Sequence, residues 1–166
     1  MKIYLIGMPG SGKSTLGHQL ADELLLSFVD LDKEIELYER KSIPEIFAEK
    51  GEDHFRQVES RLLREWAASG NSFVLATGGG APCFFNGIDV INQTGLSIFL
   101  QVPVKELLKR MEQTKGRPLL GTDDPIEKES RLVALYENRI SCYRQAKIIL
   151  QEPTLHNVLE AIQFRK

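Results

Sequence analysis

A glycine-rich turn near the start of the chain limits the possible folds more than any other feature. The apolar segment Lys2–Ile6 predicts a short buried strand, and it runs directly into the sequence GMPGSGKS, which begins at Gly7. This sequence matches the pattern GxxxxGK[ST], which requires a strand before it and a helix after it. Apolar side chains spaced four residues apart predict that helix: Leu16, Leu20 and Leu24. The chain therefore begins with the strand–loop–helix unit of a phosphate-binding α/β protein.

The chemistry of this turn follows from its residue types. Glycines allow a tight turn whose backbone N–H groups point inward, and the following helix adds the positive end of its dipole. Lys13 can reach the β- and γ-phosphates of a nucleoside triphosphate, and the Ser14 hydroxyl can bind Mg²⁺. The alternative is a chance glycine turn, which the strand–helix context disfavours. The candidate nucleotide-binding residues of the loop are Gly10, Ser11, Gly12, Lys13, Ser14 and Thr15.

Short apolar segments and helical patterns alternate along the rest of the chain. Further strands are predicted over 27–30, 72–76, 96–102 and 147–150. Helices are predicted over 33–40, 43–50, 52–68, 103–114, 126–144 and 154–164, and no element is predicted over 81–95. This alternation predicts an α/β fold in which helices cover both faces of a parallel sheet. A length of 166 residues is sufficient for one domain, 1–166, with its own core.

Charge and cysteine content exclude several classes of protein. The net charge is −2, whereas bulk binding to nucleic acid requires a basic face, so no nucleic-acid partner is expected. Cys83 and Cys142 form no CxxC pair, which indicates reduced thiols rather than a zinc site or a disulfide framework. The first apolar run is too short for a signal peptide, and no stretch could span a membrane. We expect a cytoplasmic protein that binds no membrane and, because it lacks a long apolar patch, a monomer.

Three predicted loops should meet at one edge of the sheet. Ligands of parallel sheets bind beyond the carboxyl ends of the strands, and the loops 7–14, 30–32 and 77–80 each leave a strand. Asp30 and Asp32 would point the same way along an extended segment. One carboxylate could orient Mg²⁺ through water, and the other could accept a proton from an acceptor hydroxyl. The alternative is that Asp32 caps the following helix, which would explain one aspartate but not both.

Three arginines are candidates for binding anions. Arg56 and Glu59 share a helical face, and the sequence leaves open whether Arg56 binds an acceptor carboxylate or only forms a surface ion pair. Arg117, beside Lys115 in the segment KGRPLL, is expected in a mobile loop that closes over the transferred group, the alternative being a solvated linker. Arg139 could be a second anion contact or a helix-surface charge, and nothing local decides between them.

The motifs that are missing narrow the choice of acceptor. The sequence contains no guanine-reading NKxD, and the strand over 72–76 ends in TGGG rather than in an apolar run followed by aspartate. In a chain of this length, these features favour a small-molecule kinase over a signalling GTPase or a large ATPase. A nucleotide-binding module without catalysis is the rival hypothesis. Such a module would not need all of Lys13, Ser14, Asp30, Asp32 and Arg117.

Taken together, several segments resemble the shikimate kinase family. They are GMPGSGKST, DLD, SIPEIFAEKGEDHFRQVE, TGGGA, RPLL and ENRISCYR, and the similarity extends over about residues 1–150. The resemblance implies a nucleoside-monophosphate-kinase-like, three-layer α/β/α fold with strand order 2-3-1-4-5, a substrate-binding segment at about 31–62 and a lid at about 112–125. It implies transfer of the γ-phosphate of ATP to the 3-hydroxyl of shikimate, a step toward chorismate and the aromatic amino acids. A gluconate kinase or a nucleoside monophosphate kinase is the alternative within the same class of enzyme.

The resemblance also implies roles for residues on the ATP side. Ser14 would bind Mg²⁺, with Asp30 acting on the ion through water. Lys13 and Arg117 would act on the phosphates, and Arg110 would lie against adenine.

On the acceptor side, the resemblance implies that Asp32 holds the shikimate hydroxyls and serves as the catalytic base. Arg56 and Arg139 would bind the shikimate carboxylate together. Gly79 would donate its N–H to a hydroxyl. The other residues implied to form the acceptor pocket are Phe47, Phe55, Glu59, Gly78 and Gly80.

Overall fold

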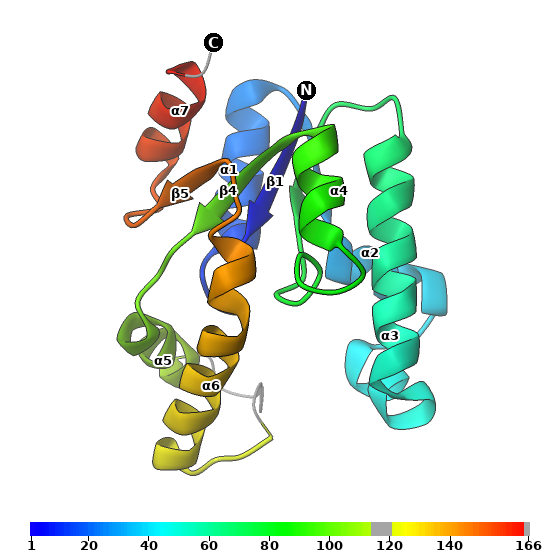
Figure 1. Ribbon diagram of the computed structural model, residues 1–166, viewed down its shortest axis with the longest axis vertical. Helices are drawn as coiled ribbons and strands as arrows, with labels where there is room; N and C mark the ends of the chain where they lie inside the picture. Colours follow the sequence, from blue (N-terminus) through cyan, green and yellow to red (C-terminus); the bar gives the residue numbers. More distant parts are fainter. Residues whose placement is uncertain (114–120, 165–166) are drawn as a thin grey trace.

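A parallel sheet of five strands runs through the centre of the molecule in the order β2-β3-β1-β4-β5 (Figure 1). The computed structural model describes residues 1–113 and 121–164. The order confirms the predicted α/β architecture and the topology that the family resemblance implies. The strands are β1 (Lys2–Ile6), β2 (Ser27–Asp30), β3 (Phe73–Ala76), β4 (Leu96–Leu100) and β5 (Ile148–Leu150).

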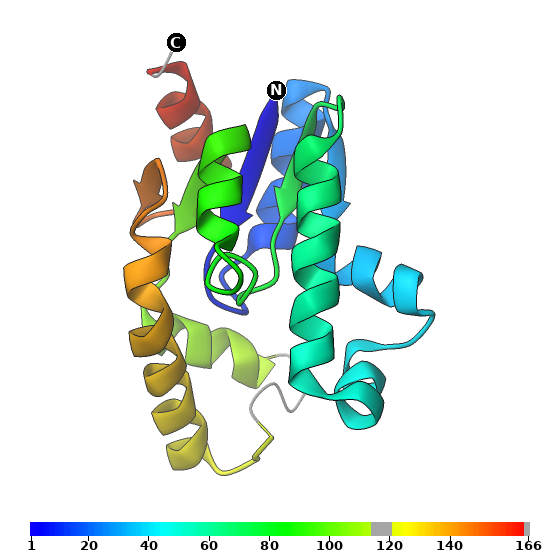
Figure 2. The same cartoon turned by 45° about the vertical axis from the view of Figure 1, so that its right-hand side comes forward.

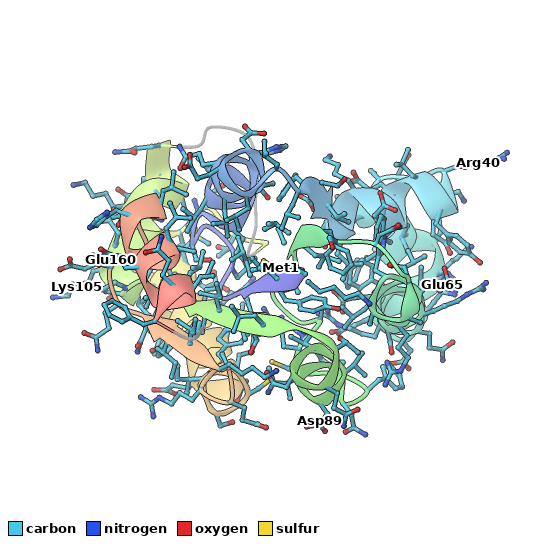
Figure 3. All side chains as sticks on the ribbon, turned by 90° about the horizontal axis from the view of Figure 1, so that it is seen from above. Met1, Arg40, Glu65, Asp89, Lys105 and Glu160 are labelled. Atoms are coloured by element: carbon cyan, nitrogen blue, oxygen red, sulfur yellow. The ribbon has the colours of Figure 1, made fainter. Side chains whose placement is uncertain are left out.

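Helices cover both faces of this sheet and produce three layers, as the view from above shows (Figure 3). One face packs against α1 (Lys13–Leu24) and α7 (Leu155–Gln163). The other face packs against α3 (Ile43–Ala68), α4 (Gly87–Thr94) and the end of α6 (Pro125–Tyr143). Side chains of β1 alternate between the two cores, because successive residues of a strand point to opposite faces.

The carboxyl ends of the strands all point toward one end of the molecule. There, α2 (Leu31–Glu39) and the first part of α3 lie on one side, and α5 (Val104–Gln113) and the first part of α6 lie on the other (Figures 1 and 2). Asp30 pairs in register with Ala76, which pairs with Leu5. Thr77 then donates from both its backbone N–H and its hydroxyl to the Leu5 carbonyl, each at 3.1 Å. The three loops therefore leave the sheet at the same level, as predicted.

A glycine breaks the long helix α3 into two segments. Gly51 has φ 81° and ψ 173°, a conformation open almost only to glycine, and it lies between the two helices predicted at 43–50 and 52–68. Ser42 caps the first segment by accepting from the Glu45 N–H, while the Glu45 side chain accepts from the Ser42 N–H. The second segment is fixed to the sheet by buried Leu62 and Leu63. Side chains of both segments form hydrogen bonds with α2, so the break kinks α3 while both parts stay attached to the fold.

The helix α4 is the main element that the sequence pattern does not predict. It is short, it follows two residues in the left-handed conformation, and Asn86 at its start makes no side-chain cap. These features remove the usual signals of a helix start. Among the described residues, no helix is both long enough and apolar enough to cross a membrane.

Candidate active site

The loop between β1 and α1 has the backbone that its glycines predict. Gly10 and Gly12 have φ 79° and 91°, which place both in the left-handed region. The Lys13 ammonium group lies inside the turn and donates to the carbonyl oxygens of Gly7 and Met8 at 3.0 and 2.9 Å. Burial lowers the pKa of Lys13 from 10.5 to about 8, and the nearby Asp32 carboxylate opposes this shift. The loop therefore holds a partly desolvated positive charge that an anion would stabilise.

Three other residues that are predicted to bind ATP lie in this loop or next to it. Arg110 of α5 donates from Nη1 to the Gly10 carbonyl at 3.1 Å, while its Nε pairs with Glu106 at 3.2 Å. Ser11 Oγ is buried and has no hydrogen-bond partner among the described residues, so it can accept or donate to a ligand. Thr15 is exposed in the first turn of α1.

One carboxylate joins the phosphate loop to the start of α2. Ser14 Oγ donates to Asp30 Oδ2 at 2.9 Å. Asp30 Oδ1 accepts from the backbone N–H groups of Asp32 at 3.1 Å and Lys33 at 3.4 Å, so Asp30 is the N-cap of α2. The alternative of Asp32 as a cap is therefore wrong, and so is the extended segment expected for Asp30 and Asp32, because the helix already begins at Leu31.

The Ser14 and Asp30 oxygens form a suitable site for one hard divalent cation. Among residues 1–113 and 121–164, no group of three His, Cys, Asp or Glu side chains could hold a metal ion. Mg²⁺ in kinases keeps several waters and is bound by one or two protein oxygens together with phosphate oxygens. A pair of neighbouring oxygens beside a phosphate loop is what such an ion requires.

The glycine triplet after β3 is where the predicted acceptor-side residues meet. A Cβ atom on Gly78 would lie 2.7 Å from Glu59 Oε2 and 2.8 Å from Asp32 Oδ1. These distances are too short for a side chain, so the triplet lets two carboxylates from α2 and α3 lie directly on its backbone.

Two guanidinium groups lie on the next two glycines. A Cβ atom on Gly79 would lie 2.7 Å from Arg139 Nη1 and 3.1 Å from Pro9 of the phosphate loop. A Cβ atom on Gly80 would lie 2.6 Å from Arg56 Cζ. Arg139 is thus part of the cluster rather than only a helix-surface charge. The contact with Pro9 shows that this cluster borders the phosphate loop.

Arg56 and Glu59 form a buried pair, not the surface ion pair that the sequence left open. Their side chains are only 10% and 2% exposed, and Arg56 Nη1 donates to Glu59 Oε1 at 2.7 Å. Burial raises the pKa of Glu59, while the positive charge of Arg56 opposes the shift. Glu59 Oε2 is buried without a hydrogen-bond partner among the described residues. A buried polar atom in this state indicates a place for a hydroxyl group or water.

Asp32 lies between the phosphate loop and this charged cluster. Burial raises its pKa, as does the negative charge of Asp30, while the positive charges of Lys13 and Arg56 oppose the shift. The raised pKa gives the carboxylate a greater affinity for a proton. Asp32 is therefore a candidate proton acceptor between the phosphate loop and the charged cluster.

Aromatic rings border the charged cluster on the α3 side. The rings of Phe47 and Phe55 are 4.7 Å apart between centroids and come from opposite sides of the Gly51 break. Phe55 is buried and Phe47 is exposed. Arg56 Cζ lies 5.2 Å from the Phe55 ring centroid and 4.3 Å from that of Phe84. Phe84 was not among the predicted site residues.

Tyr143 is a second contact that the sequence pattern did not reveal. It is fully buried, and its hydroxyl donates to the Gly79 carbonyl at 2.6 Å. Burial raises its pKa, so the hydroxyl keeps its proton for this bond. Tyr143 follows Arg139 by four residues, and this spacing on one helix face is the signal that could have linked them. Arg117 and Lys115 lie outside the described residues.

Comparison with known proteins identifies the family. The model of the shikimate kinase family matches residues 9–163. The chain is 38% identical to the shikimate kinase of Parabacteroides distasonis over 97% of this chain and 96% of that protein. The crystal structure of shikimate kinase from Bacteroides thetaiotaomicron superposes with a TM-score of 0.89 at 35% identity, covering 99% of this chain and 97% of that one. Shikimate kinase from Acinetobacter baumannii in complex with shikimate gives the same score and identity, covering 99% and 94%. The chain therefore belongs to the shikimate kinase family.

Proposed function

We propose that this enzyme transfers the γ-phosphate of ATP to the 3-hydroxyl of shikimate, with the two substrates bound end to end across the carboxyl edge of the sheet. The observation that supports this most directly is the glycine triplet. It gathers Asp32, Glu59, Arg56 and Arg139 on one side and touches the phosphate loop through Pro9 on the other. Shikimate carries one carboxylate and three hydroxyl groups, and the cluster offers two guanidinium groups for the former and two carboxylates for the latter.

The ATP site comprises the loop residues Gly10, Ser11, Gly12, Lys13, Ser14 and Thr15, together with Arg110. Lys13 binds the β- and γ-phosphates, and the N-terminus of α1 adds the positive end of its dipole. Ser14, with Asp30 through water, would hold the divalent ion, which we propose is Mg²⁺. When bound, this ion supplies positive charge that neutralises the phosphate oxygens. The role of Arg117 on the phosphates, and the lid at about 112–125, stay predictions.

In the acceptor site, Arg56 and Arg139 bind the carboxylate of shikimate and thereby fix the direction of the ring. Gly78, Gly79 and Gly80 allow the ring to approach the backbone, where the Gly79 N–H donates to a hydroxyl. Phe47 and Phe55 cover the apolar part of the ring, and the unpaired Glu59 Oε2 accepts from a bound hydroxyl or water. These residues belong to the substrate-binding segment at about 31–62, to the glycine triplet and to α6.

Asp32 accepts the proton of the shikimate 3-hydroxyl. The 3-oxygen then forms a bond to the γ-phosphorus of ATP, while the bond between the γ-phosphorus and the oxygen that it shares with the β-phosphate breaks and ADP leaves. The raised pKa of Asp32 supports this role because a more basic carboxylate takes the proton more readily. Its place between Lys13 and Arg56 supports it as well. The products are ADP and shikimate 3-phosphate, and the proton remains on Asp32 until solvent removes it.

The proposal is tested by measuring ADP release with a panel of acceptors: shikimate, its methyl ester, 3-deoxyshikimate, gluconate and CMP. We expect turnover with shikimate, a much higher KM for the ester because it lacks the carboxylate charge, and no transfer to the 3-deoxy compound. Turnover of gluconate or CMP in place of shikimate would contradict the proposed acceptor. Tight ATP binding without turnover of any acceptor would favour a binding module. A cytoplasmic location and a monomeric state stay predictions.

A further inference from the structure

Phe84 lies over the guanidinium group of Arg56 at a distance that indicates a cation–π interaction. Its ring centroid is 4.3 Å from Arg56 Cζ, closer than that of Phe55 at 5.2 Å. The Arg56 side chain is 10% exposed, so water screens this interaction little. Phe84 itself is 38% exposed, which is unusual for a phenylalanine that only fills a core.

The turn that carries Phe84 is held in a strained conformation. The next two residues, Phe85 and Asn86, have φ 50° and 56°, in the left-handed region that a phenylalanine rarely adopts. Arg64, two helical turns beyond Arg56 on α3, donates from Nη2 to the Phe85 carbonyl at 2.6 Å. Strain of this kind persists only where the surroundings enforce it, and it is often found at functional sites.

Packing within the turn fixes it further. Gly87 lies so close to the Ala81 carbonyl that no side chain fits, and its N–H donates to the Phe84 carbonyl at 3.0 Å. The Ile88 N–H donates to the Pro82 carbonyl at 2.8 Å. The backbone at Phe84 is therefore held in place between the glycine triplet and the start of α4.

A ring on the face of a guanidinium group leaves the edge of that group free. All N–H donors of arginine lie in the guanidinium plane, and stacking uses only the face. In Arg56, Nη1 donates to Glu59 at 2.7 Å and Nε donates to Glu52 at 3.4 Å, so two of its nitrogen atoms already have acceptors. The Phe84 ring, packed against the group, restricts its movement without accepting either of these two hydrogen bonds.

We propose that Phe84 is a positioning residue that holds the plane of Arg56 in the orientation that binds the carboxylate of the acceptor. This inference depends on the proposed role of Arg56 in carboxylate binding. Phe84 acts through Arg56 and not on the reacting atoms, so its loss raises the KM for shikimate while kcat and the KM for ATP stay close to those of the wild type.

The test is a double-mutant cycle of Phe84→Leu and Arg56→Lys, with Phe85→Leu as the matched control in the same turn. Phe85 is 54% exposed and lies outside the hydrophobic core, so its side chain can be shortened with little loss of packing. We expect Phe84→Leu to raise the KM for shikimate roughly threefold to tenfold, the range of a partly buried cation–π contact. Phe84→Tyr keeps the ring and should restore the wild-type KM, and Phe85→Leu should leave it unchanged.

The cycle separates the inference from the function on which it depends. In the Arg56→Lys background, Phe84→Leu should add little, because the planar group it positions is gone. Independent multiplication of the two effects would overturn the inference, as would an equal rise in the KM for ATP in Phe84→Leu. If Arg56→Lys leaves the KM for shikimate unchanged, the proposed carboxylate site itself fails. If Arg56→Lys raises the KM and Phe84→Leu does not, only the role of Phe84 fails.

Discussion

The phosphate loop lies beside the acceptor cluster, which is formed by Asp32, Arg56, Glu59 and Arg139. The two regions differ in the kind of group that they offer to a ligand. The loop is one continuous segment, fixed by glycines at positive φ, whose proposed binding groups are backbone N–H groups, one lysine and three hydroxyl groups. The acceptor cluster brings charged side chains from three helices onto a glycine triplet that contributes only backbone. Binding of a ligand by backbone groups tolerates many side-chain substitutions in the site. Binding of a ligand by side chains from several helices depends on each of those side chains. We therefore expect mutations at the two regions to affect different kinetic constants.

The largest effect is expected from Asp32→Ala, with Asp32→Asn as the isosteric control. Removal of the proposed base should lower kcat by roughly 10²- to 10⁴-fold, while ATP affinity changes little. The measurement is steady-state kinetics together with ATP titration at pH 6.5, where Lys13 keeps its proton. A large loss of ATP affinity with kcat preserved would show that Asp32 acts in ATP binding rather than in proton transfer.

A methyl group at Gly80 should damage the acceptor region alone. In Gly80→Ala, the new Cβ atom would meet the Arg56 guanidinium carbon at 2.6 Å and displace it. Loss of a charge-assisted bond of this kind should raise the KM for shikimate roughly 10- to 100-fold. The control is Gly70→Ala, since Gly70 has open space around it. An equal rise in the KM for ATP would show that the two regions are not separable.

A rise in pH should weaken ATP binding at the phosphate loop, in contrast to Gly80→Ala, which should weaken shikimate binding. Because burial lowers the pKa of Lys13 to about 8, the free enzyme loses this charge as the pH rises above 8. Bound phosphates favour the protonated form, so ATP binding takes up a proton there, and the KM for ATP should rise by up to about tenfold per pH unit. The KM for shikimate should not follow this rise. In Lys13→Arg, whose charge does not titrate, the dependence should disappear even if ATP binds more weakly.

The smallest effect is expected at the break in α3. Gly51→Ala forces a side chain into a conformation that strains it, so the free energy of unfolding should fall by about 1–2 kcal/mol, as measured by urea denaturation. Phe47 and Phe55 meet across this break, so the KM for shikimate should rise a few-fold with no change for ATP. An unchanged stability would show that the chain relaxes there without cost, and Gly70→Ala again serves as the control.

The same contrast explains which parts could be predicted from the sequence. The phosphate loop was predictable because its eight residues are contiguous and their spacing alone defines the chemistry. The pairing of Arg56 with Glu59 was predictable from helical spacing, but its burial was not, because burial depends on which helices pack over it. The position of Phe84 over Arg56 could not be predicted, since it depends on an irregular turn with left-handed residues. The capping role of Asp30 was missed because the helix begins at Leu31, two residues earlier than its apolar pattern indicates.

The two oxygens of Asp30 serve different neighbours: Oδ2 accepts from the Ser14 hydroxyl, and Oδ1 holds the first turn of the helix that carries Asp32. A carboxylate is planar and rigid, so a rotation that improves one of these bonds changes the other. We therefore expect nucleotide binding at Ser14 to affect Asp32, the proposed base, through this single side chain. Thermodynamic reciprocity then requires that whatever the first substrate does to the affinity for the second, the second does equally for the first.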